Sequence, residues 1–213
     1  MVYQKIFKAS NLPLWLYSYR ILSTSKTTGL IELITDCISL DGLKKKHDYA
    51  GSLHLHFERA YGGALDDAIE NFVQSMAAYS IVTYVLAIKD RHNGNIMIDA
   101  AGHLIHIDFG FVFGLAPGKQ FSLEKAPWKL TVEMVDVMGG RNSQHFKRYT
   151  ELCVMAFRCA RDHAKEIEGA IFYFNPFSLV ITISQALCES CLTEATIPLS
   201  ITTKMPSRIS LAV

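Results

Sequence analysis

The chain has 213 residues, of which 50% are hydrophobic and 19% are charged. A chain of this length and apolar content can build a large core without disulfide or metal staples, and it is not intrinsically disordered. Lysine and arginine number 21 against 20 acidic residues, so no broad basic field is present to hold a nucleic-acid backbone. We therefore expect one globular domain, or a domain with an appendage, that does not bind nucleic acid.

The cysteine content and the start of the chain bear on the compartment. Five cysteines is an odd number, and residues 1–11 lack the continuous apolar stretch of a signal peptide. These features predict reduced thiols in a cytoplasmic protein. No stretch reaches the roughly 18 apolar residues that a membrane span needs, so any work on a membrane is expected at its surface.

The first third of the chain predicts two strands and two helices. Residues 14–23 and 28–35 are rich in aromatic and branched side chains, which predicts two strands joined by a turn. Residues 40–46 and 52–61 suit a short helix and a longer one.

A long helix is predicted next. Asp66 or Asp67 is expected to cap it, with Glu70 as the capping-box partner, and it should run to about residue 88. Apolar and small side chains recur within it at helical spacing, which predicts core packing rather than a ligand site. These positions are Ile69, Phe72, Val73, Met76, Ala77 and Ser80.

A hairpin and two more helices follow. Residues 97–98 and 104–107 are short apolar runs around the turn signal of residues 99–102, which includes a glycine. Residues 131–138 and 144–168 favour two helices separated by a Gly-Gly pair.

The chemistry is concentrated in two motifs that flank the predicted hairpin. The run at residues 89–95 is Lys-Asp-Arg-His-Asn-Gly-Asn, and burying such side chains unpaired would be costly. It is therefore expected to be a functional loop. Asp90 and Asn95 have the D-x-x-x-x-N spacing of protein kinases, and Asp108 begins an Asp-Phe-Gly motif beyond the hairpin.

These residue types suit phosphoryl transfer. Magnesium ions on nucleotide phosphates need hard oxygen ligands, which a carboxylate and an amide carbonyl provide. A second polar group must orient or deprotonate the attacking hydroxyl. Protein kinases place His before Arg and Asp, whereas this loop reads Asp90-Arg91-His92. Because histidine side chains titrate near neutral pH, His92 is the candidate base.

The two motifs also carry a family resemblance. Residues 90–97 (DRHNGNIM) and 102–111 (GHLIHIDFGF) resemble the catalytic and activation loops of phosphatidylinositol 3- and 4-kinases. Over roughly residues 3–168 the chain resembles type III phosphatidylinositol 4-kinases. The segments that carry this second resemblance are residues 12–25, 28–36, 71–80 and 126–140.

The resemblance implies an α+β, protein-kinase-like fold. Residues 1–35 would be the last strands of the N-terminal lobe with the hinge, and residues 36–168 would be the helical C-terminal lobe. Residues 169–213 match no family pattern, and only four of these 45 residues are charged. We expect a chain that is shorter than the family's catalytic domain at both ends.

The resemblance also assigns catalytic and metal roles. His92 would take the proton from the inositol hydroxyl with Asp90 assisting, and Arg91 would brace the loop. Asn95 and Asp108 would hold Mg²⁺ or Mn²⁺.

ATP would bind between the hinge and an apolar floor. The backbone at Glu32 and Ile34 would hydrogen-bond adenine, and Ile31 would guard the back of the pocket. Met97 and Ile107 would lie beneath the base. For Ile31, Met97 and Ile107, ordinary core packing remains the alternative.

The activation segment, about residues 108–127, would choose the lipid. It contains Lys119 and Lys125, with Lys129 just beyond, and no clustered patch for a polyphosphorylated headgroup. This favours unphosphorylated phosphatidylinositol, converted to phosphatidylinositol 4-phosphate by transfer of the ATP γ-phosphate. The family implies action on Golgi or plasma membranes.

The sequence leaves two alternative hypotheses about the function. The sequence has neither a G-x-G-x-x-G loop nor the strand lysine that grips phosphates in kinases, so the chain could be a catalytically inactive fragment. A phosphatidylinositol 3-kinase-like kinase is a weaker alternative, because residues 126–140 resemble the 4-kinases instead.

Overall fold

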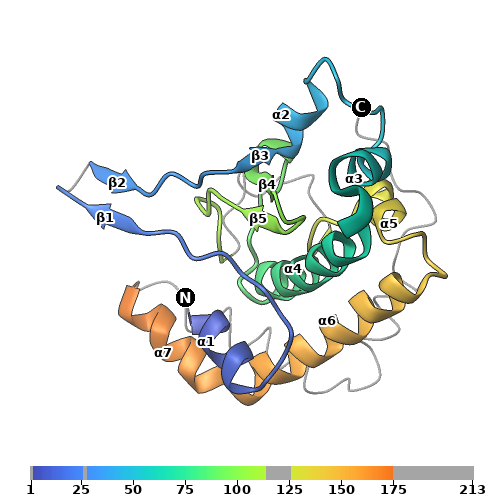
Figure 1. Ribbon diagram of the computed structural model, residues 1–213. Helices are drawn as coiled ribbons and strands as arrows, with labels where there is room; N and C mark the ends of the chain where they lie inside the picture. The colour runs from blue at the N-terminus through green and yellow to red at the C-terminus, as the bar shows by residue number, and fades with distance from the viewer. Residues whose placement is uncertain (1, 26–27, 114–125, 175–213) are drawn as a thin grey trace.

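The computed structural model describes residues 2–25, 28–113 and 126–174, with side chains to residue 171. Helices pack against a three-stranded sheet, and a separate two-stranded hairpin projects away from both (Figure 1). The α+β class expected from the sequence is therefore confirmed.

The projecting hairpin is shorter than the two predicted strands. Helix α1 (Val2–Ala9) is followed by extended chain, and the ladder contains only β1 (Ile21–Ser23) and β2 (Gly29–Ile31), with Ile21 opposite Ile31. Residues 14–20 are extended but have no strand partner. A composition typical of strands thus predicted the extended backbone correctly and the extent of pairing incorrectly.

The unpaired stretch packs on the helices instead. Leu16 is buried, and the amide of Tyr17 donates to the hydroxyl of Tyr79 at 3.2 Å. The ring of Trp15 stacks on His103 with the ring centroids 4.0 Å apart. These contacts satisfy the segment without a neighbouring strand.

The three-stranded antiparallel sheet has the order β3-β4-β5. Strands β4 (Ile96–Asp99) and β5 (Leu104–His106) form the predicted hairpin, with Ile98 opposite Leu104. Strand β3 (Cys37–Ser39) pairs with β4 on its other side, and no local pattern predicts it. Three residues are too few for an alternation pattern to stand out.

The turn of this hairpin is fixed by one carboxylate and one glycine. Asp99 Oδ1 accepts hydrogen bonds from the amides of Ala101 (2.9 Å) and His103 (2.8 Å). Gly102 has φ +92°, and a Cβ there would lie 2.7 Å from the carbonyl oxygen of Ala68. Only glycine allows this approach, so the turn packs directly on α4.

Two short helices precede the central one, each capped by a serine. The hydroxyl of Ser39 accepts from the amide of Gly42 at the start of α2 (Leu40–Lys44), and Ser52 caps α3 (Leu53–Tyr61) in the same way. A 3-10 turn, η1 (Gly62–Ala64), then leads into α4.

The start of α4 (Leu65–Val85) differs from the prediction. Its N-cap is Ala64, without a side-chain hydrogen bond, so neither Asp66 nor Asp67 caps the helix. Both lie in its first turn, where their charges favour the helix dipole. Glu70 accepts from Gln74 rather than closing a capping box. The turn η1 continues directly into α4 and leaves no extended residue to act as a cap.

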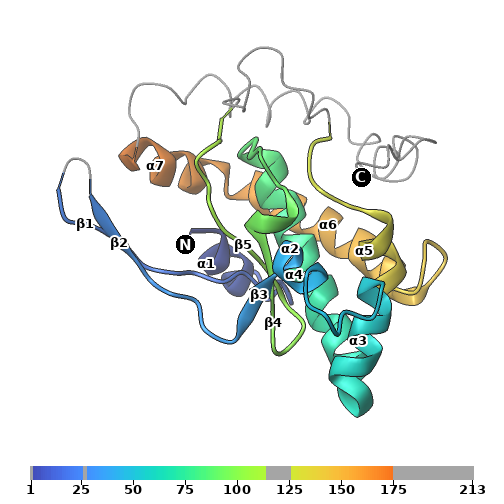
Figure 2. The ribbon, with the colours of Figure 1, turned by 90° about the horizontal axis from the view of Figure 1, so that it is seen from above.

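The remaining helices wrap around α4. Thr131 caps α5 (Val132–Val137), which agrees with the helix predicted over 131–138. The single helix predicted over 144–168 is wrong, because ψ of +22° at His163 divides it into α6 (Gln144–Asp162) and α7 (Ala164–Phe174). Helix α1 packs against both (Figure 1, Figure 2).

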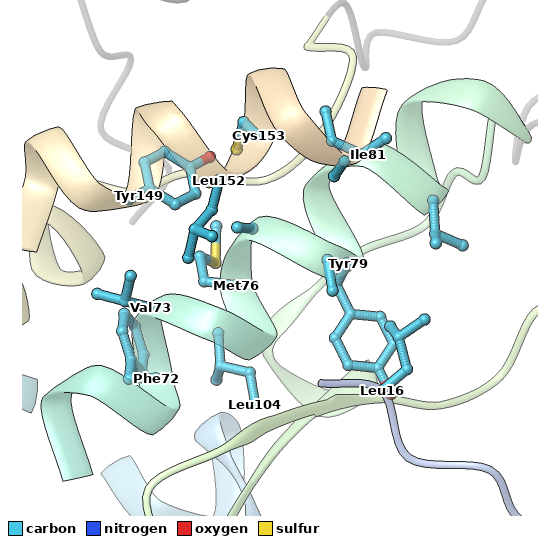
Figure 3. Close-up of a cluster of buried hydrophobic side chains, with 14 of the residues drawn as sticks. Leu16, Phe72, Val73, Met76, Tyr79, Ile81, Leu104, Tyr149, Leu152 and Cys153 are labelled. Atoms are coloured by element: carbon cyan, nitrogen blue, oxygen red, sulfur yellow. The ribbon is translucent and has the colours of Figure 1, made fainter. Parts of the chain in front are cut away.

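The core is centred on α4, which is buried on two sides. Met76 points toward Leu152 of α6, while Tyr79 lies beside Leu16, and Leu104 lies below Met76 on the sheet side (Figure 3). The periodic side chains of α4 identified in the sequence are all buried. Within the part of the chain that the structure describes, no helix has the length and apolarity to cross a bilayer.

The C-terminal end of α4 is closed by a backbone motif. The amide of Ile88 donates to the carbonyl of Thr83 at 2.9 Å, and the amide of Ala87 donates to Tyr84 at 3.2 Å. This pair of bonds defines a Schellman motif, which places Ala87 in the left-handed region with φ +46°. Glycine is the usual residue at such a position because a Cβ is strained there.

Replacing Ala87 by glycine is therefore expected to stabilise the protein. Glycine relieves the strain of the left-handed conformation, but it also raises the conformational entropy of the unfolded chain. The net expectation is a gain of about 0.5–1 kcal/mol in the free energy of unfolding. Urea denaturation followed by circular dichroism measures it. Ala78→Gly, inside α4, is the matched control and should lose about 1 kcal/mol or more. A loss at both positions would contradict the strain argument.

Candidate active site

The loop after α4 and the residues after β5 meet at one end of the β4–β5 hairpin. The loop closes with a 3-10 turn, η2 (Asn93–Asn95), directly before β4. Beyond the last ladder pair, the amide of Ile107 donates to the carbonyl of Asn95 at 3.0 Å. Asp108 is the next residue, so the hairpin holds both motifs on one support, as their spacing predicts.

Arg91 joins these two segments. Its side chain is buried, and its guanidinium donates to the carbonyls of Lys89 (3.0 Å), Ile107 (2.7 Å) and Asp108. It also lies over the ring of Phe109, 5.4 Å from the centroid. A planar fork of donors suits several fixed carbonyls at once, so the arginine fastens the catalytic loop to the start of the activation segment.

His92 and Asp90 are neighbours on the open side of the loop. The imidazole is 58% exposed, and its Nε2 lies 4.0 Å from Oδ2 of Asp90. Its Nδ1 accepts from the amide of Gly94 at 3.0 Å. That bond favours the neutral tautomer with the proton on Nε2, facing the carboxylate.

Two oxygen-bearing side chains flank the end of the hairpin. The Nδ2 of Asn95 donates to the carbonyl of Asp90 at 3.0 Å, which orients the amide oxygen away from that carbonyl. Asp108 is exposed, and its Oδ1 accepts from the amide of Gly110 at 3.3 Å. An amide oxygen and an exposed carboxylate are hard ligands, so the pair fits a magnesium ion chemically.

Backbone strain is concentrated around the same loop. Asp90 (φ +63°), Asp108 (φ +55°) and Phe113 (φ +57°) all adopt left-handed conformations without being glycine. Such conformations cost about 1–3 kcal/mol each and gather at functional sites. The sequence does not predict these conformations: aspartate is enriched in the left-handed region, but it adopts it only in a small minority of cases.

The three lysines predicted for the lipid side are placed unequally. Lys119 and Lys125 lie outside the described residues. Lys129 is half-buried, and its Nζ donates to Oδ1 of Asn93 at 2.7 Å. Its ammonium is therefore directed at the catalytic loop.

The residues predicted for the hinge lie at the end of strand β2 and just after it. The amide of Glu32 donates to the carbonyl of Arg20 at 2.9 Å, and its carboxylate accepts from the Arg20 amide at 2.8 Å. The carbonyl of Ile34 accepts from the thiol of Cys37 at 3.3 Å. Ile31 pairs with Ile21 in the hairpin and is 70% exposed.

The two predicted floor residues share one face of the sheet. Met97 lies opposite Ile105 in the ladder. Ile107 comes two residues after Ile105, just beyond the end of β5, so the two isoleucines point to the same face. Both Met97 and Ile107 are half-buried, and the sulfur of Met97 lies 3.9 Å from that of Cys37. Cys37 thus contacts one residue predicted for the hinge, Ile34, and one predicted for the floor, Met97.

Two residues to which the sequence motifs assign no role also contact the catalytic-loop and Asp-Phe-Gly motifs. The ring of Tyr19 stacks on Phe109 with centroids 6.5 Å apart. Burial raises the pKa of Tyr19, opposed by a hydrogen bond from the backbone of Asp108. The Nζ of Lys89 donates to the carbonyl of Ala126 at 3.2 Å. Both contacts cross between distant parts of the chain, which a local pattern does not reveal.

His106 is a buried histidine beneath the loop. It stacks on Tyr79 with centroids 4.5 Å apart, and its Nδ1 has no hydrogen-bond partner among the described residues. Burial, together with the charges of Arg91 and Lys129, lowers its pKa to about 3. His106 is therefore neutral in the folded protein at physiological pH.

An aspartate, a histidine and an asparagine lie on one loop beside an Asp-Phe-Gly carboxylate, in a spacing that kinases use for phosphoryl transfer. The model of the family "Phosphatidylinositol 3- and 4-kinase" matches residues 42–171. The chain belongs to this family, and the protein-kinase-like fold expected from the sequence is confirmed.

Curated relatives include several phosphatidylinositol 4-kinases. The chain is 46% identical to phosphatidylinositol 4-kinase stt4 of Schizosaccharomyces pombe over 80% of its length, and 48% identical to a phosphatidylinositol 4-kinase of Dictyostelium discoideum over 79%. It is 43% identical to phosphatidylinositol 4-kinase beta 2 of Arabidopsis thaliana over 76%. These similarities support a type III phosphatidylinositol 4-kinase catalytic domain. The chain spans 9% to 15% of the lengths of these relatives.

The buried histidine predicts a pH dependence of stability. Because the folded pKa of about 3 lies below the ordinary value of 6.5, stability is complete above pH 6.5 and falls as the unfolded chain takes up a proton. The loss is about 1.4 kcal/mol per pH unit, or roughly 2 kcal/mol between pH 6.5 and 5. Urea denaturation at several pH values measures it. His106→Phe, which keeps a ring against Tyr79, should flatten this dependence; identical pH profiles would contradict the assignment.

Proposed function

We propose that the loop at residues 89–95 and Asp108 serve transfer of the ATP γ-phosphate to the 4-hydroxyl of phosphatidylinositol, giving phosphatidylinositol 4-phosphate. The observation that carries this is the junction of the two motifs at one end of the β4–β5 hairpin, fastened by Arg91. The names of the relatives support the choice of acceptor.

His92 is the base for the inositol hydroxyl. Because Nδ1 accepts from Gly94, taking up a proton at that nitrogen breaks the bond with the amide. The ring must therefore turn in the reacting state, which its 58% exposure permits. Asp90, 4.0 Å from Nε2, stabilises the imidazolium that forms. Arg91 keeps the loop in place while the ring moves.

Asn95 and Asp108 are the proposed ligands of Mg²⁺ or Mn²⁺. The bond from Asn95 Nδ2 to the carbonyl of Asp90 fixes which atom of the amide is free to act as a ligand. The carboxylate of Asp108 is exposed at the same end of the hairpin. When bound, the ion would neutralise the charge of the ATP phosphates.

Adenine is proposed to lie between the hinge and the sheet. The amide of Glu32 donates to Arg20 and the carbonyl of Ile34 accepts from the thiol of Cys37, so the carbonyl of Glu32 and the amide of Ile34 are the proposed partners of the base. Met97 and Ile107 offer half-buried apolar surface below it. Ile31 would guard the back of this pocket.

The lipid substrate is proposed to be phosphatidylinositol without further phosphates, at a membrane surface. Lys129 is engaged by Asn93, which makes it a support of the loop more than a free phosphate ligand. Lys119 and Lys125 are the remaining cations of the segment, and they are separated in sequence. A cytoplasmic protein that works at Golgi or plasma membranes agrees with this substrate.

A chain without turnover is the second candidate function. The sequence has no glycine-rich phosphate loop and no strand lysine to hold phosphates. In addition, apolar side chains of the projecting hairpin are more than 60% exposed, which leaves the hinge side uncovered. These are Ile21, Leu22, Leu30 and Ile31. A phosphatidylinositol 3-kinase-like kinase remains the weaker alternative.

Turnover by the purified chain distinguishes these functions. With ATP, Mg²⁺ and phosphatidylinositol vesicles we expect slow formation of phosphatidylinositol 4-phosphate, because the glycine-rich loop is missing from the sequence. His92→Ala and Asp108→Asn should each reduce it by about 100-fold or more, as expected for loss of a base or a metal ligand. Product is identified by chromatography of the radiolabelled lipid.

The controls separate chemistry from folding. Asp162→Asn on α6 removes an exposed carboxylate and should leave the rate unchanged. Nucleotide binding without lipid product would support the inactive alternative. A 3-phosphorylated product, or a strong preference for phosphorylated phosphoinositides, would contradict the proposed substrate.

A further inference from the structure

Lys89 contacts both ends of the segment that separates Asp108 from α5. Its backbone amide donates to the carbonyl of Phe111 at 2.8 Å, where the segment leaves the site. Its Nζ donates to the carbonyl of Ala126 at 3.2 Å, where the segment returns. One residue of the catalytic loop thus bridges two carbonyls that are 15 positions apart in the sequence.

Lys89 is also tied to the centre of the loop. Its own carbonyl accepts from Nε of Arg91 at 3.0 Å, and the same guanidinium holds the carbonyls of Ile107 and Asp108. The two residues therefore form one connected set of bonds from the catalytic loop to the activation segment. Lys89 is the member of this pair that reaches the returning end.

The returning end has two further attachments. Trp128 Nε1 donates to the hydroxyl of Tyr149 at 3.2 Å, and that hydroxyl also lies 3.0 Å from Ser80 Oγ. Lys129 Nζ reaches Asn93 at 2.7 Å. The bond from Lys89 to Ala126 is the first of these three along the chain, so it sets where the segment arrives beside the loop.

We infer that Lys89 is a positioning residue for the proposed phosphoryl transfer: its ammonium holds the returning end of the activation segment against the catalytic loop. The inference rests on the proposed function only for its effect on rate. The length of the lysine stem suits this bridge, and a charged donor makes a stronger hydrogen bond to a carbonyl than a neutral donor does.

The hydrogen bond from Lys89 Nζ to the carbonyl of Ala126, called the clamp below, is tested first by measurements that do not depend on enzymatic turnover. In a Trp15→Phe background, Trp128 is the single tryptophan and reports on the returning end. Lys89→Met should increase amide hydrogen exchange at residues 126–131 by about tenfold, as expected when one charge-assisted bond is lost, and shift the Trp128 emission to the red. Lys89→Arg should restore both, since arginine also donates.

Two comparisons make this result specific. Exchange in α4 and α6 should stay unchanged, which separates local release from global unfolding. Lys147→Met removes an exposed lysine of α6 and should have no effect on residues 126–131. Unchanged exchange and emission in Lys89→Met would overturn the inference.

Turnover gives the second test. Lys89→Met should lower kcat on phosphatidylinositol while KM for ATP stays the same, and Lys89→Arg should recover most of the rate. A changed KM for ATP with unchanged kcat would overturn the positioning role. If the parent chain forms no product, the proposed function fails, whereas the exchange and fluorescence results still decide whether the clamp exists.

Discussion

The site depends on one buried cation. Arg91 donates to three backbone carbonyls, one before it on the catalytic loop and two just after the β4–β5 hairpin. Carbonyl oxygens have fixed positions, so a guanidinium fork that satisfies three of them fixes the segments relative to each other. Without it, each carbonyl would lose a partner in a place where water has poor access. The loop and Asp108 are held together by this interaction more than by contacts between their own side chains.

The same interaction counters local strain. Asp90 and Asp108 both have positive φ, and each of these conformations is unfavourable by itself. The strain is tolerated because the surrounding structure is rigid: α4 is packed between the sheet and α6, and Gly102 brings the hairpin turn onto α4. Buried, neutral His106 lies between this core and the loop, stacked on Tyr79. A stable helix and sheet therefore support a loop that would not keep its shape alone.

Local patterns predicted those parts of the fold that local interactions control. Ser52 and Thr131 lie at the starts of α3 and α5, and residues 99–102 form the predicted turn. Predictions failed where a neighbour decided the outcome. Because the turn η1 runs directly into α4, the N-cap is Ala64 and neither Asp66 nor Asp67 can cap the helix. The non-helical backbone of His163 divides the helix that was predicted over 144–168. Strand β3 exists because β4 provides its hydrogen-bond partners, which its own three residues do not reveal.

Motif spacing was enough to identify the family and the chemical groups of the site, because it limits which side chains a short hairpin can bring to one end. Tertiary structure alone decided the partners of Arg91, Lys89 and Lys129. Arg91 reaches Asp108 across 17 positions, and Lys89 reaches Ala126 across 37. Such bonds depend on how α4, the hairpin and the returning chain pack in three dimensions, and no periodicity encodes that packing. The sequence shows that Arg91, Lys89 and Lys129 are cations near the motifs, whereas the backbone and side-chain groups that they hold in place are known only from the folded structure.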